Sequence, residues 1–149
     1  MRLPVKSLIA TLGVASLLIA GCGAPTVENS PAVYDDSALS EVRDMYELYS
    51  KTNKKAPKSL KDFSLFSDGS PTGFSAIKQG NVVVIWDVEL NPEREADSAD
   101  EVLAFAKEVP ENGGAVLMKN RSIKTMTAEE FKAAPKAGPI EEPKAKKAG

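Results

Sequence analysis

The stretch SALSEVRDMYELYSKTN, residues 37–53, predicts a helix on which the rest of the chain can be arranged. Apolar residues recur in it at helical spacing, and charged side chains occupy the opposite face. Ser37 is a suitable N-cap, and Asn53 followed by Pro57 predicts the end of the helix. We interpret its two tyrosines as core residues rather than as a ligand-stacking surface. The apolar face comprises Leu39, Val42, Met45, Tyr46 and Tyr49.

After this helix the apolar residues change to the alternating period of strands. Ser59 first caps a short helical turn at Leu60–Phe63, and we then expect a strand at Phe74–Lys78. A tight turn at residues 79–81 leads into a longer strand at Val82–Leu90, which is apolar on both faces at its start and therefore belongs near the centre of a sheet. Trp86 shares one face of this strand with four apolar neighbours, so we expect it in the core.

The last third of the chain alternates short apolar runs with turn signals. Val102–Val109 fits either a short helix or a strand, and residues 110–114 form an expected hairpin loop. Strands are predicted at Ala115–Lys119 and Ser122–Thr125, with Asn120 and Arg121 as the turn between them. Thr127 and Glu130 have the spacing of a capping box, which predicts a final helix that ends before Pro135.

These elements predict an α+β fold, in which an N-terminal helix packs on a small antiparallel sheet of four or five strands and a short helix closes the chain. The domain is expected to span residues 37–133. Residues 22–36 are expected to form a flexible tether, because they contain prolines and little apolar periodicity. Residues 134–149, rich in Lys, Pro and Ala, are expected to form a disordered tail. The alternative for the tail is a contact with an anionic partner.

The N-terminus has the features of an export signal. Arg2 and Lys6 precede an apolar run of about 14 residues, which is shorter than the roughly 20 residues of a membrane span. The sequence Ile19-Ala20-Gly21-Cys22 resembles the lipobox of bacterial lipoproteins. The resemblance implies that residues 1–21 are a signal peptide and that the Cys22 thiol is acylated. Such an anchor would hold the protein in the cell membrane or the outer membrane without spanning it.

The composition argues against several classes of activity. The 149 residues contain no histidine, so the most common general base and the most common transition-metal ligand are both missing. Without Arg2 and Lys6, the 19 basic side chains fall to 17 against 21 acidic ones, which does not suggest nucleic acid as a partner. Cys22 is the only cysteine and is assigned to lipid. We therefore expect no catalytic residues and no enzymatic activity.

One acidic segment has ligand-like chemistry. Glu93, Glu95, Asp97, Asp100 and Glu101 crowd oxygen donors into a predicted loop, and calcium takes six to eight such ligands. Asp97, Asp100 and Glu101 are the candidate ligands. The alternative is a solvated acidic loop, because the spacing is not that of an EF-hand and no glycine sets the turn.

Two parts of the chain resemble one family. They are residues 45–62, which contain MYELY and APKSLKD, and residues 113–131, which contain GGAVLM and MTAEEF. Together they are similar to planctomycete-type proteins related to the C-terminal heads of pilin-like proteins and type II secretion pseudopilins. The resemblance implies a helix on a small antiparallel sheet, and implies a strand rather than a helix at residues 101–107. The chain departs from the family in having no prepilin cleavage signal and no long apolar assembly helix.

From these observations we expect a lipid-anchored protein of the cell envelope that acts as a non-enzymatic scaffold or interaction module. The resemblance suggests that it is accessory to a secretion or pilus-like system. A calcium-dependent envelope binding module is the alternative. The expected partners are the membrane, through the anchor, and an envelope protein whose identity the sequence leaves open, as it does the oligomeric state.

Overall fold

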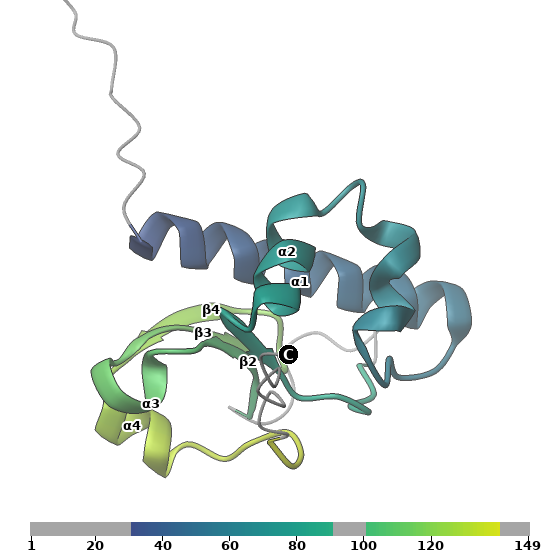
Figure 1. The fold of residues 1–149 in the computed structure, drawn as a ribbon. Coiled ribbons are helices and arrows are strands. Elements are labelled where there is room, and N and C mark those ends of the chain that lie inside the picture. Colours follow the sequence, from purple (N-terminus) through teal and green to yellow (C-terminus); the bar gives the residue numbers. More distant parts are fainter. Residues whose placement is uncertain (1–30, 91–100, 141–149) are drawn as a thin grey trace, which may run out of the picture.

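A 23-residue helix, α1 (Pro31–Asn53), lies along one face of a four-stranded antiparallel sheet (Figure 1). The computed structural model describes residues 31–90 and 101–140. The strands β1 (Val82–Val84), β2 (Val102–Ala106), β3 (Gly114–Met118) and β4 (Ile123–Met126) follow one another across the sheet in chain order. The short helices α3 (Val109–Asn112) and α4 (Ala128–Ala133) lie on the other side of the sheet. The predicted α+β class is therefore confirmed.

The apolar face predicted for α1 is buried as expected. All five of its predicted apolar residues belong to the core between α1 and the sheet. The Tyr46 hydroxyl donates a hydrogen bond of 2.9 Å to the backbone carbonyl of Ile85, and its ring meets Phe63 edge to face at 5.6 Å between centroids. Burial raises the pKa of this phenol well above its usual value. Both tyrosines are core residues, as the sequence predicted.

The start of α1 differs from the prediction. The helix begins at Pro31 rather than after Ser37, so residues 31–36, assigned above to the tether, are helical. Proline suits the first turn of a helix, because its fixed φ is already helical and its missing N–H would have no partner there. The apolar pattern did not reveal these turns, since Ala38 is the first residue of α1 whose side chain is buried.

The prediction of a strand at Phe74–Lys78 is wrong. These residues lie in α2 (Pro71–Gln79), which begins at a proline and ends at Gly80, whose φ of 77° is left-handed. Phe74 and Ile77 are both partly buried against the core and are three residues apart, a spacing that puts them on one face of a helix but on opposite faces of a strand. The Gly80 turn between α2 and β1 is the tight turn predicted at residues 79–81.

The strand expected at Val82–Leu90 is shorter than predicted. β1 ends at Val84, although the Ile85 N–H still donates to the Leu103 carbonyl at 2.9 Å. Asp87 then adopts a φ of 60° and its N–H donates to the Pro57 carbonyl at 2.8 Å, so the chain leaves the sheet. Trp86 is half-buried and its ring lies 5.4 Å from that of Phe63, in agreement with the expected core position.

The last third of the chain follows the prediction closely. Residues 102–106 form β2, as the resemblance implied, and every residue of β2 is buried. The hairpin between β3 and β4 turns at Asn120 and Arg121, where Arg121 accepts a φ of 71°. The predicted capping box opens α4: the Thr127 hydroxyl accepts the Glu130 N–H, and the Glu130 carboxylate accepts the Thr127 N–H. The loop expected at residues 110–114 instead contains most of α3.

The domain does not end at residue 133. Val102 of β2 donates its N–H to the Pro135 carbonyl and accepts the Ala137 N–H, both at 2.9 Å. The Lys136 ammonium donates to the carbonyls of Phe131 and Ala134 at 2.5 Å each, at the end of α4. Residues 134–140, assigned above to the disordered tail, therefore continue the fold. This return was not predicted, because it depends on the backbone groups of Val102, which carry no sequence signal.

Gly73 in α2 allows the close crossing of α1 and α2. A Cβ atom at this position would lie 2.8 Å from the Glu41 Cβ and 2.9 Å from the Ala38 carbonyl oxygen. We expect Gly73→Ala to lower the free energy of unfolding by about 1–3 kcal/mol, since two helix backbones would have to separate. This loss exceeds the gain in helix propensity, which is at most about 1 kcal/mol.

Gly69→Ala is the matched control, because its Cβ would meet one atom only, at 3.7 Å. Chemical denaturation of both variants gives the comparison. Equal stability of the two variants would contradict the account of the helix crossing.

The hydrogen bond from Tyr46 to Ile85 joins α1 to the chain that follows β1. Tyr46→Phe keeps the ring but leaves a buried carbonyl without this donor, so we expect a loss of about 1–3 kcal/mol in the free energy of unfolding. Tyr34→Phe, at an exposed position, should change stability by less than about 0.5 kcal/mol. Thermal melts of the two variants at equal concentration test this expectation, which fails if Tyr46→Phe is as stable as the parent.

Candidate functional site

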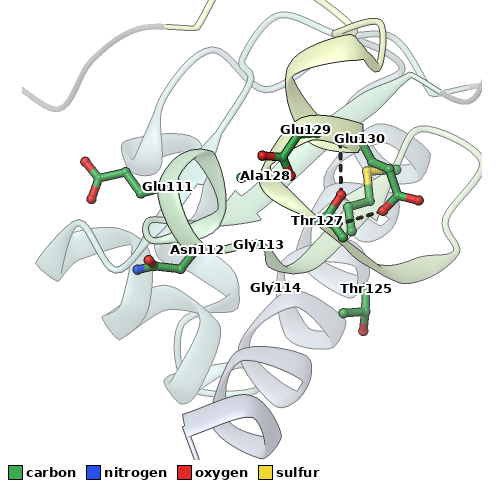
Figure 2. A pocket seen from close by; sticks show the side chains of 10 residues that line it. Glu111, Asn112, Gly113, Gly114, Thr125, Thr127, Ala128, Glu129 and Glu130 are labelled. Atoms are coloured by element: carbon green, nitrogen blue, oxygen red, sulfur yellow. Dashed lines mark hydrogen bonds between the residues drawn. The ribbon is translucent and has the colours of Figure 1, made fainter.

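One surface depression lies between α3, α4 and the end of β4 (Figure 2). It has a volume of about 610 Å³ and three carboxylates on its rim, from Glu111, Glu129 and Glu130. In Figure 2, Glu111 lies well apart from the Thr127–Glu130 pair, so the carboxylates do not converge. The depression thus holds no convergent pair of carboxylates of the kind in which one acid raises the pKa of the other.

Glu130 in this depression has a structural role. Its carboxylate accepts the Thr127 N–H at 2.8 Å, and its own N–H donates to the Thr127 hydroxyl at 3.2 Å (Figure 2). The bond from the Thr127 backbone, followed by the one from its side chain, lowers the pKa of Glu130. The carboxylate is held by the start of α4, where it caps the helix. We therefore do not assign a binding role to this depression.

A second depression, which we call the α1 groove, lies at the start of α1 and has a volume of about 790 Å³. α1 forms one wall, and the opposite wall comes from the beginning of α2, the turn before β1 and the end of β2. A hydrogen bond from the Lys107 N–H to the Asn81 carbonyl, 2.9 Å long, joins the last two parts. The lining residues are Pro31, Val33, Tyr34, Asp35, Ser37, Thr72, Asn81, Ala106, Lys107 and Glu108.

The packing of α2 against α1 holds the two walls of the α1 groove in place. Gly73, next to Thr72, brings the α2 backbone against α1 at Ala38, and its N–H donates to the Glu41 carboxylate at 2.7 Å. The first two turns of α1 extend beyond this crossing, and their side chains are largely exposed. A rigid helix thus presents its first turns to solvent beside the end of the sheet.

The α1 groove combines apolar and acidic side chains. Val33 is 44% exposed and Tyr34 is 40% exposed, and both line the groove, whereas Leu48, which is 48% exposed on the same helix, does not. Asp35 is partly buried, and this burial, followed by the charges of Glu108 and Asp36, raises its pKa. Lys107 is the single basic residue in the lining. The groove therefore has an excess of negative charge next to an exposed aromatic ring.

None of the candidate site residues predicted from the sequence is among the described residues that line the α1 groove. Cys22, Asp97 and Asp100 lie outside the described residues. Glu101, the third candidate calcium ligand, forms an ion pair of 2.9 Å with Lys119 across the β2–β3 hairpin. Within residues 31–90 and 101–140, no group of three or more acidic side chains is placed to hold a metal ion. Nothing in the described part of the chain thus favours the calcium site.

The α1 groove was missed because residues 31–36 were assigned to the tether. A signal was present, since Ser30-Pro31 has the pattern of a helix start and Val33 and Tyr34 stand next to the acidic pair Asp35-Asp36. The other wall could not be predicted. It joins residue 72 to residues 106–108, and only the tertiary structure brings these positions to α1.

Comparisons with known proteins leave the family open: no family model matches the chain, and neither a curated protein nor a solved structure is significantly similar to it. The resemblance to pseudopilin heads therefore stays a prediction. As for membrane spans, none of the helices in the described ranges has the length and apolar character to cross a bilayer.

The raised pKa of Asp35 predicts a pH effect. A carboxyl group whose pKa is higher in the folded than in the unfolded protein stabilises the fold below the unfolded value, near 3.8, and loses that contribution as the pH rises. At pH 7 the charged group therefore opposes folding. We expect Asp35→Asn to raise the melting temperature slightly at pH 7 and to have no effect near pH 3. Asp44→Asn, on an exposed part of α1, is the control. A lower melting temperature for Asp35→Asn at pH 7 would contradict this account.

Proposed function

We propose that this protein is a lipid-anchored interaction module of the cell envelope, that its binding surface is the α1 groove, and that it acts without catalysis. The observation that carries the proposal is the exposure of Val33 and Tyr34 beside a groove on the helix that directly follows the tether. Exposed aromatic and apolar side chains are the usual anchors of protein interfaces. A rigid helix can present them at little cost in conformational entropy.

The position of the α1 groove fits the proposed lipid anchor. Cys22 and Pro31 are nine residues apart, and nine extended residues span at most about 30 Å. A lipid on Cys22 would therefore keep the groove close to the membrane surface, where an envelope partner could be met. The anchor would concentrate both proteins in the same thin layer, so even a weak contact would be well occupied.

A role in filament assembly is not part of the proposal. In the described residues α1 uses its apolar face against the sheet, and that face is not free to pack in a filament. An accessory role beside a secretion or pilus-like system remains compatible with a helix packed on an antiparallel sheet. The accessory role is supported by the resemblance to pseudopilin heads alone. Neither palmitate labelling at Cys22 nor photo-crosslinking at Tyr34 depends on that role.

The anchor is tested with Cys22→Ser. We expect the parent protein to incorporate radiolabelled palmitate and to partition into the membrane fraction and into detergent. The variant should incorporate no label, because the acylated thiol is missing. Equal labelling of parent and variant would contradict the assignment of Cys22.

The binding surface is tested with a photo-reactive amino acid at Tyr34. We expect it to give one discrete adduct with an envelope protein in intact cells, and we expect Val33→Ser to reduce the yield about tenfold by removing an adjacent apolar contact. The control is the same photo-reactive residue at Leu65, which is 90% exposed in the helical turn η1 (Leu60–Phe66) and does not line the groove. The proposal fails if both positions give the same adducts or if Val33→Ser has no effect.

A further inference from the structure

We propose that the lysine-bearing C-terminal segment, residues 141–149, binds in the α1 groove of its own chain. The inference deepens the proposed function, because it names cationic segments with small side chains as the chemistry that the groove accepts. It depends on that function only for the choice of the groove. Charge, reach and the shape of the site each favour this contact.

Charge complementarity is the first observation. The α1 groove has Asp35 and Glu108 in its lining, Asp36 close to Asp35, and one basic residue, Lys107. These carboxylates have no ion pair with a described residue. Residues 141–149, EEPKAKKAG, contain Lys144, Lys146 and Lys147. A cation near the groove would relieve the repulsion among its carboxylates and gain their attraction.

Reach is the second observation. Gly138 lies beside β1, since a Cβ atom at this position would be 3.1 Å from the Ile85 side chain. Ile85 is four residues after Asn81, which lines the α1 groove, and four residues of extended chain cover about 13 Å. The six residues from Gly138 to Lys144 can extend over about 20 Å. The lysines of the segment are therefore close enough to enter the groove of the same chain.

The shape of the site is the third observation. The α1 groove has a volume of about 790 Å³, and Tyr34, which is partly exposed, lies in its lining. Apart from its lysines and two glutamates, the segment contains only Pro, Ala and Gly. Such residues can approach a groove floor closely, and a lysine can lie over the face of the tyrosine ring. The two glutamates come first in the segment, so they are nearer in sequence to Gly138 than the lysines are.

The contact should be reversible and sensitive to salt. Ion pairs at a surface are individually weak, and they hold a segment here because linkage in one chain gives a high effective concentration. A partner with a similar cationic segment would then compete with residues 141–149 for the same carboxylates. The segment would act as an internal competitor that favours partners of higher affinity.

The test uses the mature chain extracted from membranes, with a photo-reactive amino acid in place of Ala145. After illumination, mass spectrometry locates the adducts. We expect them at residues 31–37 or 106–108. The double variant Asp35→Asn with Glu108→Gln should reduce their yield about tenfold, as the loss of two surface ion pairs predicts. Raising the salt concentration from 0.05 M to 0.5 M should have a similar effect.

The matched control is Glu111→Gln with Glu129→Gln, which removes two carboxylates from the other depression. It should leave the yield unchanged. A mixture of isotope-labelled and unlabelled chains distinguishes contacts within one chain from contacts between copies. Adducts that join labelled to unlabelled chains overturn the inference in favour of a second copy, and adducts scattered over the surface overturn it altogether.

The two proposals can fail separately. If the probe at Tyr34 captures an envelope protein but the probe at Ala145 does not reach the α1 groove, the contact of the segment is refuted and the proposed function stands. If the probe at Ala145 reaches the groove and no partner is captured at Tyr34, the contact stands and the proposed function is refuted.

Discussion

The packing of one apolar face of α1 against the sheet is the constraint on which the other features of this protein depend. The Tyr46–Ile85 hydrogen bond joins the middle of α1 to the chain that follows β1. The contact between the Tyr46 and Phe63 rings joins α1 to η1. Gly73 brings α2 onto the same helix at a distance that no side chain would permit. Because α1 is held along its middle and its C-terminal half, its first turns project as a rigid extension. That extension forms one wall of the α1 groove.

Both faces of the sheet are apolar and have to be covered, and the helices after β2 cover the face that α1 leaves open. β2 is buried at all five positions, since α1 covers one face and α3 and α4 cover the other. The ring of Phe105 lies 4.7 Å from that of Phe131 in α4, on the face away from α1. Residues 135–137 then bond to Val102, and the Lys136 ammonium both caps the end of α4 and lies 4.2 Å from the centre of the Phe131 ring. The return of the chain thus stabilises the second face and brings Gly138 beside Ile85, three residues before the C-terminal segment begins.

The proposed binding surface at the start of α1 would suit a protein held by the proposed short tether. The turns that precede Ala38 contribute little to the core, so their side chains are free to be selected for contact rather than for packing. The same turns carry Asp35 and Asp36. Glu108, just after the end of β2, adds a third negative charge near Asp35. An acidic groove near a membrane surface would repel anionic headgroups, and this favours a cationic protein segment as its occupant.

Local patterns in the sequence determined the course of α1 from Ser37 onward, the β3–β4 hairpin and the capped helix α4. Each of these elements is specified by neighbouring residues, through helical spacing, alternation or a capping box. The prediction at Phe74–Lys78 was wrong, because the two apolar residues three positions apart share one face of a helix, whereas they would lie on opposite faces of a strand. The strand at Val82–Leu90 ended early because Asp87 donates to Pro57, a contact that alternation in the sequence cannot report.

The tertiary structure alone decided which residues meet at the α1 groove and where the domain ends. The groove joins residues 31–37, 72, 81 and 106–108, and Val102 holds Pro135 and Ala137 through backbone groups that are the same in every residue. Periodicity reports which side of an element is buried, but it does not report which distant element covers that side. For this chain, α1 from Ser37 onward, β3, β4 and α4 were predictable from the sequence, while α2, the site and the domain boundary depended on long-range packing, and the anchor at Cys22 stays a prediction.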